Sequence, residues 1–175
     1  MNIFATIRAG NRVKRYHTQE ILKEERVGQH CANVCAILID LYHPHLPPAD
    51  LLVYALRHDV AEQYTGDMPA NVKKERPALK VAMEEVEMDW ELEHWPRSRP
   101  TDVDMAVFKF ADAMDCALKC CEELLMGNRM VTHMAFRAME YMGRAQGEIS
   151  AFHPACRRAL QLRKIVNQEM ENACK

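Results

Sequence analysis

The stretch Leu51-Leu52-Val53-Tyr54-Ala55-Leu56-Arg57-His58-Asp59 decides how this sequence folds. It is an apolar segment that ends in a histidine followed directly by an aspartate. Because Pro48 precedes a plausible helix start, we predict a helix over residues 50–64 with His58 and Asp59 in its last turns. Imidazole and carboxylate groups both bind divalent cations, although a lone His-Asp pair more often marks a helix end or a buried histidine. The stretch therefore predicts a helical fold and a candidate metal site.

A second histidine, His30, lies on another predicted helix. The apolar positions around it recur at steps of three and four, which is typical of one buried helix face, and His30 lies at the edge of that face. These positions are Val27, Cys31, Val34, Leu38 and Leu41. His30 is therefore either a metal ligand or a core histidine bonded to the backbone, and the same alternative holds for His58.

An acid, Asp112, lies in the apolar stretch Phe108-Lys109-Phe110-Ala111-Asp112-Ala113-Met114-Asp115. Burying a carboxylate is costly unless it is paired or coordinated. A salt bridge to Lys109 or Arg129 would pair it, and a metal ion would coordinate it. Two imidazoles and two carboxylates can hold a divalent cation with open coordination positions, and such a cation can activate water and neutralise a phosphoryl oxygen. We therefore predict one metal site with four ligands: His30, His58, Asp59 and Asp112.

The rest of the sequence predicts further helices and no strand, so the predicted fold class is all-α. Three prolines in residues 43–48 forbid a helix there, and we expect a turn at 65–69, an irregular stretch to Pro77 and a loop at 95–100. Acids crowd one face of the helix predicted over 77–94, which we interpret as a solvated face rather than a metal site. The other predicted helices cover residues 19–26, 28–42, 132–150 and 154–173, together with one that begins at Thr101 and carries Asp112.

Composition narrows the class of protein. The 175 residues are long enough for one domain with a real core, 49% of them are hydrophobic, and no apolar run approaches the roughly 20 residues of a membrane span. The N-terminal residues lack a convincing secretory signal, so we expect a cytoplasmic protein. Seven cysteines lie mostly in helical apolar stripes without a CxxC pair, as small core residues do. A net charge of −2 gives no general attraction to nucleic acid polymers.

The four candidate ligands resemble, one for one, those of the HD-domain metal-dependent phosphohydrolases. In that family the ligands come from a first histidine, an adjacent His-Asp pair and a distant aspartate on a later helix. The sequence is most similar to small single-domain members, namely the 5′-deoxynucleotidases and the phage deoxynucleoside triphosphohydrolases, including those acting on dATP. The resemblance spans residues 12–126. It implies a compact all-α HD-domain bundle, one domain over residues 1–175, with the metal site between helices.

The resemblance also implies roles for other residues. It places Glu62 and Asp67 in the catalytic group, with Glu62 moving a proton as general acid or base, whereas the alternative for Glu62 is an ordinary surface glutamate. The pair Arg15-Tyr16 matches an arginine and an aromatic residue that flank the substrate pocket, although the usual aromatic residue there is tryptophan. Tyr16 would exclude a 2′-hydroxyl, and Lys73 would bind phosphate with Arg15. The alternative is that residues 11–17 are a basic, solvated strand without a special role.

The function implied by the resemblance is metal-dependent hydrolysis of deoxynucleotides. We expect conversion of dATP to deoxyadenosine and tripolyphosphate, with a 5′-deoxynucleotidase acting on monophosphates as the alternative and a catalytically silent nucleotide-binding HD domain as an alternative of another class. The cofactor is a divalent ion among Co, Mn, Zn, Fe and Mg, and two imidazoles favour a transition metal over Mg. The expected partners are a deoxynucleotide and further copies of the chain in a homo-oligomer, with no nucleic acid polymer and no membrane.

Overall fold

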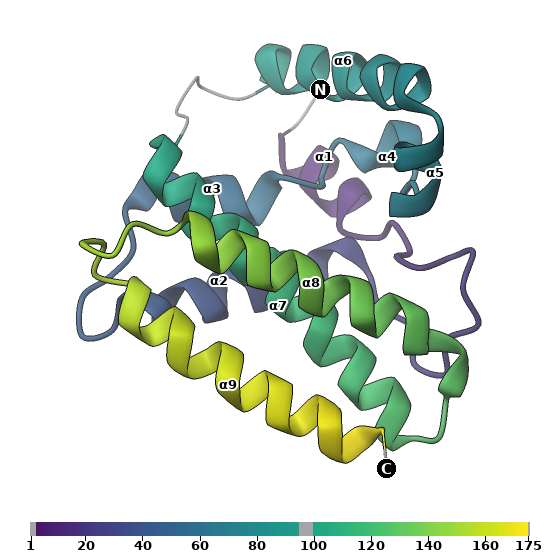
Figure 1. The fold of residues 1–175 in the computed structure, drawn as a ribbon. Helices are drawn as coiled ribbons and strands as arrows, with labels where there is room; N and C mark the ends of the chain where they lie inside the picture. The colour runs from purple at the N-terminus through teal and green to yellow at the C-terminus, as the bar shows by residue number, and fades with distance from the viewer. Residues whose placement is uncertain (1–2, 95–99, 175) are drawn as a thin grey trace.

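A computed structural model of the protein describes residues 3–94 and 100–174, and this part of the chain is a bundle of helices (Figure 1). The only β-type pairing among the described residues is an isolated antiparallel bridge between Lys14 and Arg26. The predicted all-α fold is confirmed, whereas residues 95–99 of the predicted loop lie outside the described residues. The elements are α1 (Ile3–Gly10), α2 (Val27–Tyr42), α3 (Ala49–Arg57), α4 (Glu62–Thr65), α5 (Ala70–Glu75), α6 (Pro77–His94), α7 (Asp102–Leu125), the 3-10 turn η1 (Arg129–Val131), α8 (Thr132–Glu148) and α9 (Cys156–Ala173).

Helix α7 is the centre of the bundle. It packs against α8, α2 and α9, and α3 closes one side of the same core (Figure 1). Phe110 and Leu124 of α7 and Leu38 of α2 are fully buried side chains of this core. Each such side chain contributes about 1.5–3 kcal/mol by leaving water. As predicted, Thr101 begins α7, because its side chain accepts a hydrogen bond from the backbone N–H of Asp104.

The helix predicted over residues 50–64 is interrupted. Helix α3 ends at Arg57, residues 58–61 form a turn, and α4 follows. Tertiary packing explains the interruption: Val60 is fully buried in a small cluster with Trp90 of α6, and a Cβ on Gly10 would lie 2.6 Å from the Val60 carbonyl oxygen. The His-Asp pair therefore lies at a bend in the chain rather than inside a helix.

The helix predicted over residues 19–26 is absent. The sequence there is rich in helix formers, but its backbone groups bond to distant parts of the chain. Glu123 of α7 accepts hydrogen bonds from the N–H groups of Leu22 (2.7 Å) and Lys23 (3.0 Å), and the carbonyl of Glu25 accepts the N–H of Arg15 (3.0 Å). These bonds replace the intrahelical ones, so tertiary contacts override local propensity.

The predicted and observed elements differ in smaller ways in the middle and at the end of the chain. Residues 70–75, predicted to be irregular, form the short helix α5 between Pro69 and Pro77, where the chain offers too few residues for a periodic pattern. The turn predicted at 65–69 is shorter and irregular: Thr65 is the last residue of α4, residues 66–69 form a connection without regular structure, and Gly66 ends α4 with a φ of 72°, which favours glycine. Helices α8 and α9 are slightly shorter than predicted. Among the described helices, none combines the length and apolarity needed to cross a membrane.

Candidate metal centre

The four predicted metal ligands lie together where α2, the 58–61 turn and α7 meet. His30 Nε2 lies 3.2 Å from His58 Nε2 and 3.1 Å from Asp112 Oδ1. Asp59 Oδ2 lies 3.3 Å from His58 Nε2 and 3.6 Å from His30 Nε2. His30 is fully buried, whereas the side chains of Asp59 and Asp112 are 22% and 31% exposed. The cluster is therefore closed on the core side and open to solvent on the carboxylate side.

These distances fit one shared cation. Ligand atoms about 2.0–2.2 Å from an ion lie about 3 Å from each other when they subtend a right angle at it. The ligand atoms of His30, His58 and Asp112 all lie within 4.8 Å of one another. The donor set of two imidazole nitrogens and carboxylate oxygens is the type that transition metals bind with positions left for water.

The Nδ1 atoms of His30 and His58 each have a hydrogen-bond partner, and these partners orient the rings so that Nε2 faces the cluster. His30 Nδ1 lies 2.6 Å from Asp115 Oδ2, and His58 Nδ1 lies 2.9 Å from the Ala55 carbonyl oxygen. With the proton on Nδ1, each ring donates to its partner and directs the lone pair of Nε2 into the cluster. Asp115 was not singled out by sequence reasoning, although its position three residues after Asp112 places both acids on one face of α7.

The electrostatics of the cluster favour a positive charge. Burial lowers the pKa of His58, but the charge of Asp59 outweighs burial and raises the pKa well above its usual value. Burial is likewise outweighed at His30, whose pKa is raised by hydrogen bonds to Asp112 and Asp115. Burial would raise the pKa of Asp59, yet the neighbouring His58 and Arg15 lower it strongly. The carboxylates around the two imidazoles thus favour a positive charge at this point, which is the charge that a bound cation would bring.

Arg15 joins the segment before α2 to the metal centre. Its Nη1 donates to Asp59 Oδ2 at 3.1 Å, and its Nε lies 3.4 Å from Glu25 Oε1. The Arg15 side chain is only 10% exposed, so the two acids hold a cation beside the cluster. This placement does not fit the alternative of a solvated strand without contacts, although a role for Arg15 in binding phosphate stays a prediction.

Tyr16 has an unusual backbone. Its φ is 56°, which makes it the one non-glycine residue with positive φ among the described residues. Its N–H donates to Asp67 Oδ2 at 2.8 Å, and the Arg15 guanidinium lies 5.2 Å from the centre of its ring. Asp67 therefore connects residues 66–69, which follow α4, to the 15–16 segment by accepting the backbone N–H of Tyr16. A direct catalytic role for Asp67 stays a prediction.

Glu62 is a buried acid, not a surface residue. It is 6% exposed at the start of α4, one turn after Asp59. Burial first, and then the charges of Asp59 and Asp67, raise the pKa of Glu62 to about 9, while Lys73 acts in the opposite direction. Its alternative as an ordinary surface glutamate is therefore wrong. Burial next to the cluster is compatible with a proton-transfer group, but this role and that of Lys73 stay predictions.

The alternatives to metal binding find little support in the contacts. Lys109 pairs with Glu148, and Arg129 donates to the Ala173 carbonyl, so neither neutralises Asp112. Of the two histidines, only His58 has a backbone partner among the described residues. The acids of α6 are largely exposed, in agreement with the prediction of a solvated face.

Comparisons with known proteins agree with this picture. The family model described as 5′-deoxynucleotidase YfbR-like matches residues 2–98, a span that includes His30, His58, Asp59 and Glu62 but ends before Asp112. A 5′-deoxynucleotidase of Photobacterium profundum is 25% identical over 149 residues, covering 73% of this chain and 77% of that protein. A 5′-deoxynucleotidase of Yersinia pestis is 28% identical over 149 residues, covering 73% of this chain and 76% of that protein.

A solved structure shares the fold. The cyanophage S-2L HD phosphohydrolase DatZ, bound to dA and one catalytic Zn²⁺ ion, superposes with a TM-score of 0.62 and 19% identity over 96% of this chain and 98% of that one. This likeness confirms the predicted HD-domain fold. Because the family model covers more than half of the sequence, the expected kinship with HD-domain phosphohydrolases is confirmed as well. The chain belongs to the YfbR-like 5′-deoxynucleotidase family.

Proposed function

We propose that this protein is a metal-dependent 5′-deoxynucleotidase that releases orthophosphate from deoxynucleoside monophosphates. The observation that carries the proposal is that His30 Nε2 lies 3.2 Å from His58 Nε2, 3.6 Å from Asp59 Oδ2 and 3.1 Å from Asp112 Oδ1, beside two carboxylates that are partly exposed to solvent. The naming of the relatives as 5′-deoxynucleotidases supports the monophosphate as substrate. Zn²⁺ in the structural neighbour supports a divalent transition metal at these ligands.

The chemistry requires little from the protein beyond charge, orientation and one proton transfer. A divalent ion, when bound, would lower the pKa of a water molecule and neutralise charge on the phosphoryl group. In the reaction, water adds its oxygen to phosphorus, the bond between phosphorus and the 5′ oxygen breaks, and the 5′ oxygen takes up a proton. Glu62, buried one turn after Asp59, handles that proton. Arg15, fixed by Asp59 and Glu25, supplies a second positive charge beside the phosphate.

Sugar selectivity belongs to the same proposal. Tyr16 would pack its ring against C2′ and leave no partner for a 2′-hydroxyl, which disfavours ribonucleotides. Asp67 supports this role indirectly, since it accepts the Tyr16 N–H. The conversion of dATP to deoxyadenosine and tripolyphosphate is the second candidate, and the binding of dA by the structural neighbour DatZ supports an adenine nucleotide as substrate. Assembly as a homo-oligomer and a cytoplasmic location stay predictions from the sequence.

The test is product release from a matched panel of nucleotides. We would incubate the protein with Co²⁺, Mn²⁺, Zn²⁺, Fe²⁺ or Mg²⁺ and the four deoxynucleoside monophosphates, AMP and dATP, and separate orthophosphate from tripolyphosphate by ion chromatography. Orthophosphate from the deoxynucleoside monophosphates is the expected product. Tripolyphosphate from dATP alone would replace the proposal with the second candidate, and neither product from a metal-loaded protein that still binds nucleotide would identify a catalytically silent domain.

A pair of variants separates catalysis from binding. Glu62→Gln should retain the metal and the nucleotide but turn over about 100-fold more slowly or worse, since it loses the proton-transfer group. Glu75→Gln, an exposed acid of α5, is the matched control and should resemble the wild type. Equal turnover of the two variants at saturating substrate would remove Glu62 from the mechanism.

A further inference from the structure

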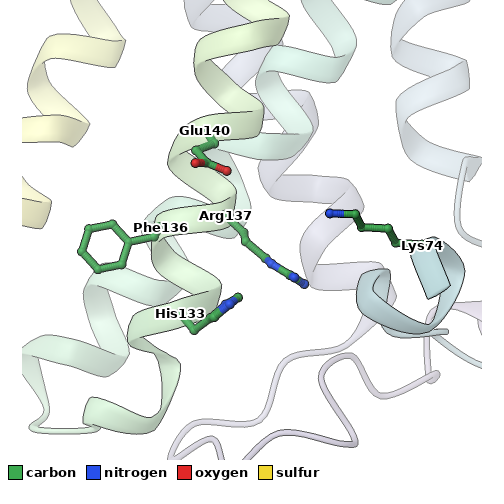
Figure 2. Close-up of a pocket in the computed structure, with 5 residues that line it drawn as sticks. All are labelled: Lys74, His133, Phe136, Arg137 and Glu140. Atoms are coloured by element: carbon green, nitrogen blue, oxygen red, sulfur yellow. The ribbon is translucent and has the colours of Figure 1, made fainter.

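A hollow of about 280 Å³ lies beside α2 and α7, and we call it the Asp115 hollow. Its lining includes Asp115, whose carboxylate bonds to His30 Nδ1, but none of the four predicted metal ligands. The polar lining residues are Glu25, Gln29, Asn33, Asp115, Lys119 and Glu122. Three of these six residues are buried, whereas the lining residues of the hollow between α5 and α8 are all exposed (Figure 2). The Asp115 hollow therefore has a floor that is shielded from water.

Two buried carboxylates lie at the floor of the Asp115 hollow. Glu25 is 3% exposed and Asp115 is 4% exposed, and ligand atoms of these two residues and of His30 lie within 4.8 Å of one another. Glu25 Oε1 is buried and accepts no hydrogen bond from the described residues, since its contact with Arg15 Nε at 3.4 Å is an ion pair without hydrogen-bond geometry. A buried carboxylate oxygen without a donor is costly unless a cation coordinates it. Glu25 is therefore a candidate ligand.

The nearby positive charges are already bound to other acids. The Lys119 ammonium, which lines the hollow, donates to Glu123 Oε1 at 2.8 Å. Arg15, the cation beside Glu25, also donates to Asp59 Oδ2 at 3.1 Å. Each of these cations thus serves an acid outside the hollow, so the charge of the two buried carboxylates is only partly balanced. A further cation in the hollow would balance it.

The other donors that line the hollow are oxygen atoms. Gln29 and Asn33 lie four residues apart on one face of α2, and their side-chain amides offer carbonyl oxygens. Glu122 adds a carboxylate at the exposed rim. Carboxylate and amide oxygens are the ligands of hard divalent cations, and Ca²⁺ accepts an irregular set of six to eight of them together with water. The two sites therefore differ in kind, because imidazoles at the metal centre favour a transition metal.

We propose that the Asp115 hollow is a second metal site, which binds a hard divalent cation such as Ca²⁺ through Glu25, Asp115 and the amide oxygens of Gln29 and Asn33. The site goes beyond the proposed function, because no step of the hydrolysis uses it. Asp115 links the two sites, since one of its oxygens accepts from His30 Nδ1 while the other can bind the cation. A cation on Asp115 weakens its hold on His30, so each ion should weaken the binding of the other by the same factor.

Equilibrium dialysis with radioactive Ca²⁺ tests this site on the full chain loaded with Co²⁺. We expect one bound Ca²⁺ per chain in addition to the Co²⁺. Glu25→Gln should weaken Ca²⁺ binding about tenfold because it removes one of the two buried carboxylates, whereas Asn33→Asp should strengthen it about fivefold by adding a charged ligand. A gain in affinity cannot arise from damage to the fold. The matched control is Glu24→Gln, since Glu24 is exposed and does not line the hollow.

The Asp112→Ala variant separates the two sites. It lacks a ligand of the metal centre, so the folded variant should lose Co²⁺ and still bind one Ca²⁺ per chain. Loss of Ca²⁺ binding in this variant would place the ion at the metal centre and overturn the proposal. Equal Ca²⁺ affinities of Glu25→Gln and Glu24→Gln, or no Ca²⁺ bound by the wild type, would also overturn it.

The link between the sites has its own measurement. Saturating Ca²⁺ should weaken Co²⁺ binding to the wild type about fivefold in a competition titration, and an unchanged Co²⁺ affinity would overturn the link through Asp115. All these readouts are binding of metal ions. They can fail while orthophosphate release from deoxynucleotides succeeds, and the reverse.

Discussion

Replacing Glu123 by Gln should destabilise the protein by about 3 kcal/mol at neutral pH. Glu123 is fully buried, and its oxygens accept hydrogen bonds from the N–H of Leu22 (2.7 Å), the N–H of Lys23 (3.0 Å), the Lys119 ammonium (2.8 Å) and the Asn128 amide (2.7 Å). Burial alone would raise the pKa of Glu123, but these donors lower it from 4.5 to about 2. At about 1.36 kcal/mol per pKa unit, this difference gives the figure of about 3 kcal/mol.

The direction in which the stabilisation by Glu123 changes with pH follows from its lowered pKa. The contribution of Glu123 is complete above pH 4.5 and is lost as the pH falls towards 2, since the unfolded chain binds the proton first. In Glu123→Gln the amide nitrogen would face a donor, and the ammonium of Lys119, whose side chain is 3% exposed, would lose its buried counter-charge. The difference in unfolding free energy between wild type and variant should therefore narrow as the pH is lowered.

Urea denaturation followed by circular dichroism at several pH values between 7 and 2 measures this difference. The matched control is Glu122→Gln, because Glu122 pairs with Lys23 at 3.0 Å but both side chains are more than half exposed. We expect Glu122→Gln to lower the free energy of unfolding by less than about 0.5 kcal/mol at any pH. A cost for Glu123→Gln below about 1 kcal/mol at pH 7, with no dependence on pH, would refute the assignment of Glu123 as the anchor of the segment before α2.

Three further predictions concern the metal centre. Asp112→Ala should lose the bound metal and activity together, and full metal occupancy by elemental analysis would contradict its role as a ligand. Asp115→Asn should weaken metal affinity about 10–100-fold in a competition titration because a neutral amide holds the His30 ring less firmly, and wild-type affinity would show that Asp115 is only a packing residue. Tyr16→Ala should reduce the preference for dAMP over AMP about tenfold while Tyr16→Phe preserves it, and equal ratios in all three proteins would remove the ring from sugar selection.

The sequence predicted the helices whose buried residues recur at regular steps, and it predicted the residues that lie together at the candidate metal centre. Helix α2 follows from apolar residues at steps of three and four, because one of its faces is buried in the core, whereas α7 was predicted from its start at Thr101 and is buried on most of its sides. The His-Asp pair, His30 and Asp112 indicated a common site through the types of their side chains. In the structure, His30 Nε2 lies within 3.6 Å of an atom of each of the other three side chains.

Other features depend on contacts that local sequence does not contain. The segment 20–25 has helical propensity, but the partner that unwinds it, Glu123, lies about a hundred residues away. The bend at His58-Asp59 depends on Gly10 and on Trp90 of α6. The orientation of His30 by Asp115 is visible only once α2 and α7 are packed, although two acids three residues apart on an apolar helix were a signal that could have been followed.

The left-handed backbone of Tyr16 has a consequence for how substrate preference can change. A residue other than glycine pays roughly 1–2 kcal/mol for this conformation, and the bond from its N–H to Asp67 helps to offset the cost. Glycine or asparagine at position 16 would relax the chain but remove the ring, whereas valine or isoleucine would add strain. If the Tyr16 ring excludes the 2′-hydroxyl as proposed, laboratory selection for stability should therefore drive this position towards residues that accept ribonucleotides. Selection for discrimination should retain aromatic residues there and favour compensating substitutions elsewhere in the fold.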